Sequence, residues 1–91
     1  MPTSTLNTAI RRFDEWDKPW RFRESVTATL DRSDAEPFEQ VWREATDASH
    51  WTDGDLAACA KRASSALRLR FTILDRQAAD AVARAAAYQW R

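Results

Sequence analysis

The apolar positions in the first third of the chain recur at helical spacing. They fall three or four residues apart, which is the pattern of an amphipathic helix. We expect this helix to begin near Ser4 or Thr5, whose hydroxyls can cap it, and to end at Asp17 or Lys18, because Pro19 would break a helix interior. A second helix follows with the proline in its first turn, and one kinked helix is the alternative. The apolar positions of this region are Leu6, Ala9, Ile10, Phe13, Trp16, Trp20, Phe22, Val26 and Leu30.

A third helix is expected in the middle of the chain. Ser33 and Glu36 have the spacing of a capping box, in which each side chain bonds to the other's backbone N–H. Pro37 lies slightly late for that box, so Asp34 or Glu36 is the alternative N-cap. The side chains expected on the buried face of this helix are Phe38, Val41, Trp42 and Ala45.

The last third of the chain predicts one long helix or two shorter ones. The segment Thr52-Asp53-Gly54-Asp55 is a second capping signature. No Gly or Pro follows it, and the apolar residues beyond share one arc as far as Tyr88. A single helix over about residues 55–90 fits this pattern. A break near residues 72–76, with Asp75 capping a fifth helix, fits it as well.

Arg70 complicates the single-helix reading because it falls within the apolar arc. A buried arginine needs a carboxylate partner or a route to solvent. The helix is therefore distorted near residues 69–73, or Arg70 pairs with an acid of the third helix, or it lies at the edge of the arc. Residues 67–73 also alternate with a period of two, but the rest of the chain offers no second strand for a sheet.

Composition supports an all-α fold. One glycine among 91 residues is too few for the turns of a sheet protein, and the chain after Leu56 is rich in alanine, the best helix former. A chain of this length buries roughly two-thirds of its unfolded surface. We therefore predict a single helical domain over residues 1–91, a compact bundle of four or five helices whose C-terminal helix is long or broken near residues 72–76.

The formal net charge is zero, which disfavours strong non-specific binding to nucleic acids or acidic membranes. The charges are nevertheless unevenly placed. Residues 31–55 hold eight acids and two bases, a net of −6, whereas residues 56–74 hold four bases and no acid, a net of +4. We expect the two stretches to pair with each other inside the fold, and recognition of a charged partner is the alternative.

The chain offers little material for catalysis or for cofactor binding. His50 is the single histidine and lies between Asp47 and Asp53; we expect a solvated loop residue. Cys59 falls on an apolar arc and is expected to be buried. Gly54 is the single glycine, which excludes glycine-rich phosphate loops. We therefore expect no enzyme, no metal site and no cofactor.

The N-terminal segment lacks the charged and apolar regions of a signal peptide, and no apolar run approaches the length of a membrane span. A lone cysteine permits no internal disulfide. The expectation is a cytoplasmic protein with no membrane partner.

Five tryptophans are more than a bundle of this size is expected to bury, and tryptophan and arginine are enriched at binding hot spots. Trp51 lies in a loop and Trp90 is the penultimate residue, so these two are the main candidates for a protein contact; folding over a neighbouring helix is the alternative for each. Arg70 and Trp20 complete the candidate set, although Trp20 shares a predominantly core seam with Phe13.

These features favour a non-enzymatic protein–protein interaction module: an adapter, a small inhibitor or immunity-type protein, or a subunit of a larger complex. The partner would be another protein or a second copy of the chain, joined through the alanine-rich arc. Nucleic-acid binding through Lys61, Arg62 and Arg68 is the alternative, and an enzyme that uses His50 ranks third.

Overall fold

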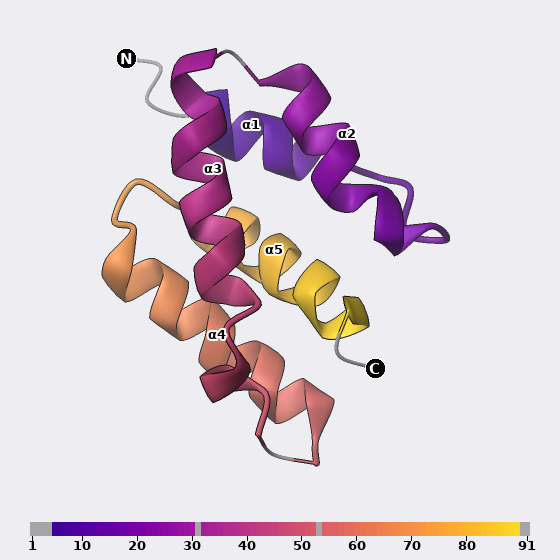
Figure 1. The fold of residues 1–91 in the computed structure, drawn as a ribbon, viewed down its shortest axis with the longest axis vertical. Helices are drawn as coiled ribbons and strands as arrows, with labels where there is room; N and C mark the ends of the chain where they lie inside the picture. Colours follow the sequence, from indigo (N-terminus) through magenta and orange to yellow (C-terminus); the bar gives the residue numbers. More distant parts are fainter. Residues whose placement is uncertain (1–4, 31, 53, 90–91) are drawn as a thin grey trace.

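The computed structural model describes residues 5–30, 32–52 and 54–89, and this part of the chain is all-α. Its helices are α1 (Thr5–Arg12), α2 (Phe22–Thr29), α3 (Arg32–Ala45), α4 (Leu56–Arg70) and α5 (Arg76–Gln89). The 3-10 turn Pro19–Arg21 precedes α2, and the 3-10 turn Ala48–His50 lies between α3 and α4. Figure 1 shows α1 and α2 at one end of the molecule, α4 at the other and α3 running between them. The predicted bundle of four or five helices is confirmed.

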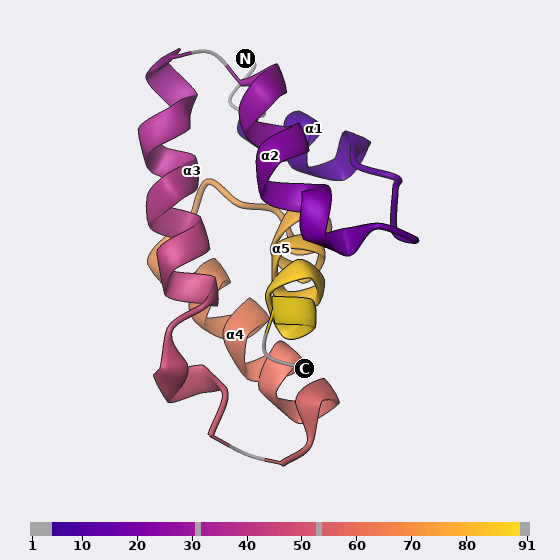
Figure 2. The same ribbon diagram turned by 45° about the vertical axis from the view of Figure 1, so that its right-hand side comes forward.

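Helix α5 is the element on which the other parts of the bundle pack. It pairs with α4 as a helical hairpin and also contacts α1, α3 and the turn Pro19–Arg21 (Figures 1 and 2). Most of its buried side chains are alanines, which allow neighbouring helices to approach closely on several sides. The buried residues are Ala78, Ala79, Val82, Ala83, Ala85 and Ala86. The alanine arc that we expected to be available for self-association therefore lies largely inside the core.

An aromatic cluster joins the first three helices. The Phe22 ring is fully buried, and its centroid lies 5.2 Å from that of Phe13, 5.9 Å from that of Trp16 and 5.8 Å from that of Trp42. Edge-to-face and offset pairs of this kind add to the free energy of burial. The predicted buried face of α3, residues 38, 41, 42 and 45, is confirmed in full.

Helix α1 ends at Arg12, five residues or more before the predicted end at Asp17 or Lys18. The chain turns after Phe13, and Lys18 N–H donates to the Glu15 carbonyl at 2.8 Å. The turn brings Trp16 back onto the Phe22 ring. Trp16 therefore still packs with the apolar residues of this region, although the helix has already ended. The free energy gained by burying the aromatic cluster outweighs the free energy of continuing the helix.

The predicted capping box of α3 is wrong. The helix begins at Arg32, so Ser33, Asp34 and Glu36 all lie inside it, and Pro37 is accommodated within the helix. Proline removes one backbone hydrogen bond from a helix. The four core side chains of the later turns more than offset that loss.

The chain breaks between α4 and α5, as one of the two predictions for this segment had it. Asp75 caps α5 by accepting from the Ala78 N–H at 2.8 Å. Asn7, buried on α1, holds the connection in place: its amide donates to the Ile73 carbonyl at 2.8 Å and accepts from the Asp75 N–H at 3.0 Å. A single helix would leave this buried amide without partners, so Asn7 favours the break.

Candidate protein-binding groove

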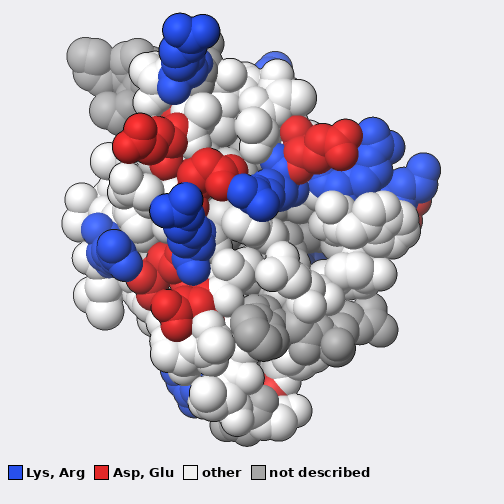
Figure 3. Space-filling view, viewed as in Figure 1, with Lys and Arg blue, Asp and Glu red and all other residues white. Residues whose placement is uncertain are grey.

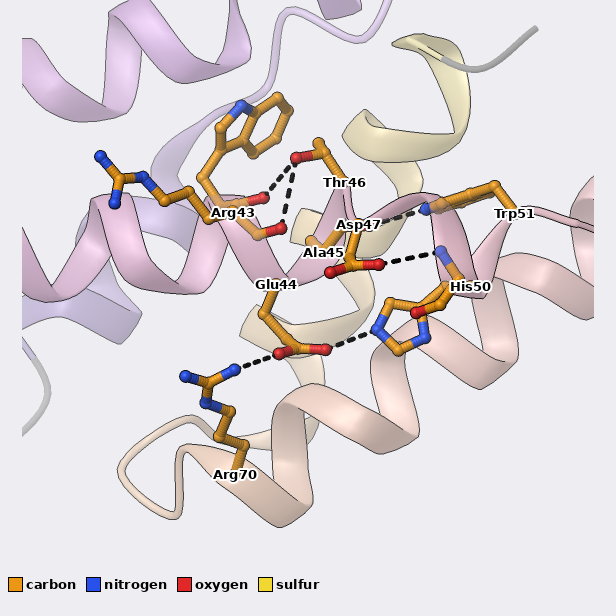
Figure 4. Close-up of polar contacts among 10 residues, drawn as sticks. Arg43, Glu44, Ala45, Thr46, Asp47, His50, Trp51 and Arg70 are labelled. Carbon is orange, nitrogen blue, oxygen red and sulfur yellow. Dashed lines mark hydrogen bonds and ion pairs between the residues drawn. The ribbon is translucent and has the colours of Figure 1, made fainter.

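The single histidine belongs to a polar cluster at the end of α3. Figure 4 shows the Glu44 carboxylate between His50 and Arg70. The His50 Nε2 lies 2.6 Å from Glu44 Oε2, and the Arg70 guanidinium donates to Oε1. The His50 side chain is 13% exposed and that of Glu44 is 16% exposed. The prediction of a solvated loop histidine is therefore wrong, and the acid that bonds the ring is Glu44.

Hydrogen bonds and nearby charges favour the ionised forms of two carboxylates here, those of Glu44 and Asp47. The hydrogen bond from His50, assisted by the one from Arg70, holds the pKa of Glu44 below its ordinary value against the opposing effect of burial. The pKa of Asp47 is also lowered, because the Ser49 backbone N–H donates to its carboxylate at 2.9 Å. Both acids are thus stabilised as anions by groups of the fold itself.

Trp51 completes the same end of the molecule. Its indole N–H donates to the Ala45 carbonyl at 2.7 Å, and the residue is only 8% exposed. The geometry matches the alternative prediction for Trp51, in which the side chain folds over a neighbouring helix instead of contacting another protein. Trp51 and His50 together fasten the 3-10 turn to α3.

A catalytic triad would need a hydroxyl or thiol presented to the second ring nitrogen of His50 and open to a substrate. Cys59 is fully buried in α4, as predicted, and the Thr46 hydroxyl lies 2.9 Å from the Trp42 carbonyl that it bonds. Within residues 5–30, 32–52 and 54–89, three metal-ligating side chains do not gather anywhere. The geometry accounts for the cluster as a tie between α3, the 3-10 turn and α4.

Charged side chains of both signs alternate over the α3 face. Figure 3 shows them intermixed rather than gathered by sign. Arg23 of α2 pairs with Glu39, and Arg70 of α4 pairs with Glu44. The second pair joins the acidic and basic stretches of the sequence. Of the three alternatives for Arg70, pairing with an acid of the third helix is found, and the helix also ends at Arg70, whose side chain is 63% exposed. Lys61, Arg62 and Arg68 are exposed on α4.

Among the tryptophans in the part of the chain that the structure describes, Trp20 is the exposed one. It lies in the turn before α2, is 62% exposed, and its ring centroid is 5.9 Å from that of Tyr88 at the end of α5. The two rings border a hollow of about 320 Å³. Its walls are Pro19, Trp20, Arg23, Trp42, Ala85, Tyr88 and Gln89.

A second hollow, of about 460 Å³, adjoins the first and shares Pro19 and Tyr88 with it. The Arg84 guanidinium lies over the Trp16 ring, 4.1 Å from the centroid, a cation–π contact that fixes both side chains in the wall. We name the two hollows together the aromatic groove. The walls of the second hollow are Trp16, Asp17, Pro19, Leu56, Arg84, Ala87 and Tyr88.

A third hollow, of about 430 Å³, continues from the aromatic groove between α4 and α5 and shares Leu56, Arg84 and Ala87 with it. We name it the alanine groove. Its walls are Leu56, Ala57, Ala60, Lys61, Arg76, Asp80, Ala83, Arg84 and Ala87. The three hollows thus form one continuous surface feature around the C-terminal half of α5.

The predicted binding residues are not brought together. Trp20 lines the aromatic groove and Lys61 lines the alanine groove. Arg70 bonds Glu44 and Trp51 bonds the Ala45 carbonyl, in the group of residues at the end of α3 that we name the Glu44 cluster: Glu44, His50, Trp51 and Arg70. Trp90 lies outside the described residues. Sequence reasoning missed Tyr88 and Arg84 because both lie on a helix whose pattern indicated only core and solvent.

No family model matches this chain, and searches of curated proteins and of solved structures find no significant match either. Among the described residues, helices fall short of the length and apolarity needed to cross a membrane.

Proposed function

We propose that this chain is a non-enzymatic protein-recognition module that binds its partner along the aromatic groove. The single observation that carries the proposal is the exposure of Trp20, 62%, beside Tyr88 at the mouth of a hollow. An exposed indole beside a phenol and an arginine is the combination most enriched among binding hot spots.

The rest of the fold supports this choice by contrast. Trp42 and Trp51 are buried, and Trp16 is covered by Arg84. Trp20 gains far less from the fold than these do, and unlike the more exposed Leu69 it borders a hollow together with Tyr88, which favours a partner contact at Trp20. An adapter, an inhibitor or immunity-type protein, and a subunit of a larger complex all use such a surface, and a cytoplasmic setting suits each of them.

The proposal is tested by capture from a nuclease-treated lysate of the source organism with three matched baits: the unaltered chain, Trp20→Ala and Leu69→Ser. Leu69 is the control because it is 84% exposed and lies outside the groove. We expect a defined polypeptide that the unaltered chain and Leu69→Ser retain and Trp20→Ala loses.

A polypeptide retained equally by all three baits would contradict the groove as the binding site. A parallel capture from untreated lysate tests the alternative function: recovery of a nucleic acid that nuclease and added salt remove would favour binding through Lys61, Arg62 and Arg68, which are exposed on α4.

A further inference from the structure

We propose that the partner segment is an acidic amphipathic helix that lies in the alanine groove. The inference rests on the proposed function and adds the shape and the charge of the occupant.

The walls of the alanine groove are built from pairs of residues four apart on each helix. Leu56 and Ala60 form one row on α4, and Ala83 and Ala87 form the facing row on α5. Rows with this spacing are the ridges between which the side chains of another helix pack. Three of these four side chains are methyl groups and Ala83 is itself only 2% exposed, so a third helix can approach the hairpin closely over Ala60 and Ala87.

Along the alanine groove the acid is already bonded, whereas two of the cations have no acidic partner among the described residues. Asp80 is already engaged, since the Ser64 hydroxyl donates to it at 2.6 Å and Arg76 lies 4.0 Å away. Lys61 and Arg84 also line the groove, and neither has an acidic partner among the described residues. Carboxylates on the occupant would complement these two cations.

An acid of the chain itself lies near one of these two cations. Asp17 lines the adjoining hollow of the aromatic groove, which Arg84 also lines, whereas Lys61 lines the alanine groove alone. Carboxylates of the occupant therefore belong first beside Lys61 and then beside Arg84, and its apolar stripe faces Leu56 and the alanines.

The test uses two labelled peptides of about 20 residues, long enough to be partly helical alone. Both carry the same leucine and alanine stripe; one has glutamates on its flanks and the other has lysines at the same positions. Fluorescence anisotropy at low salt should show the glutamate peptide binding about tenfold more tightly, because one peptide gains two surface ion pairs and the other meets two repulsions.

Charge reversal supplies the matched control. Lys61→Glu with Arg84→Glu should reverse the preference between the peptides, whereas Arg68→Glu, on the same helix but outside the groove, should leave it unchanged. Circular dichroism would confirm that the variants remain folded.

Equal affinity for the two peptides, lost in Ala87→Leu, which changes a wall residue of the alanine groove, would overturn the acidic occupant and leave the alanine groove as a binding site. Failure of both peptides would overturn the inference while the lysate capture still decides the proposed function. A sedimentation mass of two copies, with the groove closed to both peptides, would show that the occupant is a second chain and would equally overturn it.

Discussion

The end of α3 and the groove beside α5 both gather aromatic and charged side chains, but they differ in how those side chains are satisfied. In the Glu44 cluster, the carboxylate is bonded on both oxygens and the Trp51 N–H reaches a backbone carbonyl. Along the groove, Trp20 is open and Lys61 has no acidic partner among the described residues. The fold explains the first region, whereas for the second we propose a partner.

The largest expected effect separates the two tryptophans. Trp51→Ala leaves a cavity and an unpaired carbonyl, so we expect a loss of about 3–5 kcal/mol in the free energy of unfolding. Trp20→Ala should change it by less than about 1 kcal/mol, since most of that side chain is already in water. Urea unfolding of both variants checks the pair, and similar losses would contradict the distinction between the regions.

Two adjacent alanines of α5 allow the core and the groove to be compared on one helix. Ala86 is fully buried, whereas Ala87 lines the groove and is only partly buried. Ala86→Leu should overpack the core and destabilise the fold by about 1–3 kcal/mol. Ala87→Leu should leave stability nearly unchanged and obstruct the groove. Thermal unfolding together with partner capture measures both effects, and a destabilised Ala87→Leu would show that the groove floor is part of the core.

The contribution of Glu44 to the free energy of unfolding should depend on pH. Because the pKa of Glu44 is lowered in the folded chain, its contribution is present above its unfolded pKa, about 4.3, and is lost as the pH falls through the folded pKa. Near neutral pH, Glu44→Gln should cost about 1–2 kcal/mol. Urea unfolding in acid should show a smaller difference from the unaltered chain, and a difference that grows in acid would contradict the assignment.

Much of the fold could be predicted from the sequence, because its signals are local. The apolar face of α3 and the burial of Cys59 follow from helical spacing. The cap at Asp75 and the pairing of Arg70 with an acid of α3 were each among the alternatives that the sequence left open. The early end of α1 could not be predicted, since it depends on the Trp16 ring returning to Phe22 across a turn.

The candidate site was harder to predict, because its walls come from segments distant in sequence. Trp20 and Trp51 both lie beside a turn, and only the packed structure shows that one indole finds a carbonyl whereas the other meets Tyr88 at the surface. Arg84 has no local signal that distinguishes it from an ordinary solvated arginine of α5.

The smallest expected effect on stability is that of Lys61→Glu, within about 0.5 kcal/mol, because the side chain is exposed and unpaired among the described residues. Its effect on recognition should nevertheless be clear, with weaker binding of the glutamate peptide. Arg68→Glu is the control for a general change of charge, and equal weakening by both variants would point to long-range electrostatics instead.

The most direct measurement is a proton–nitrogen NMR titration that follows the indole N–H signals while the captured partner is added. The account predicts that the signals of Trp20 and Trp16 shift and that the signal of Trp51, which is bonded to Ala45, stays in place. A shift of the Trp51 signal with the Trp20 signal unmoved would contradict it and would place recognition at the end of α3.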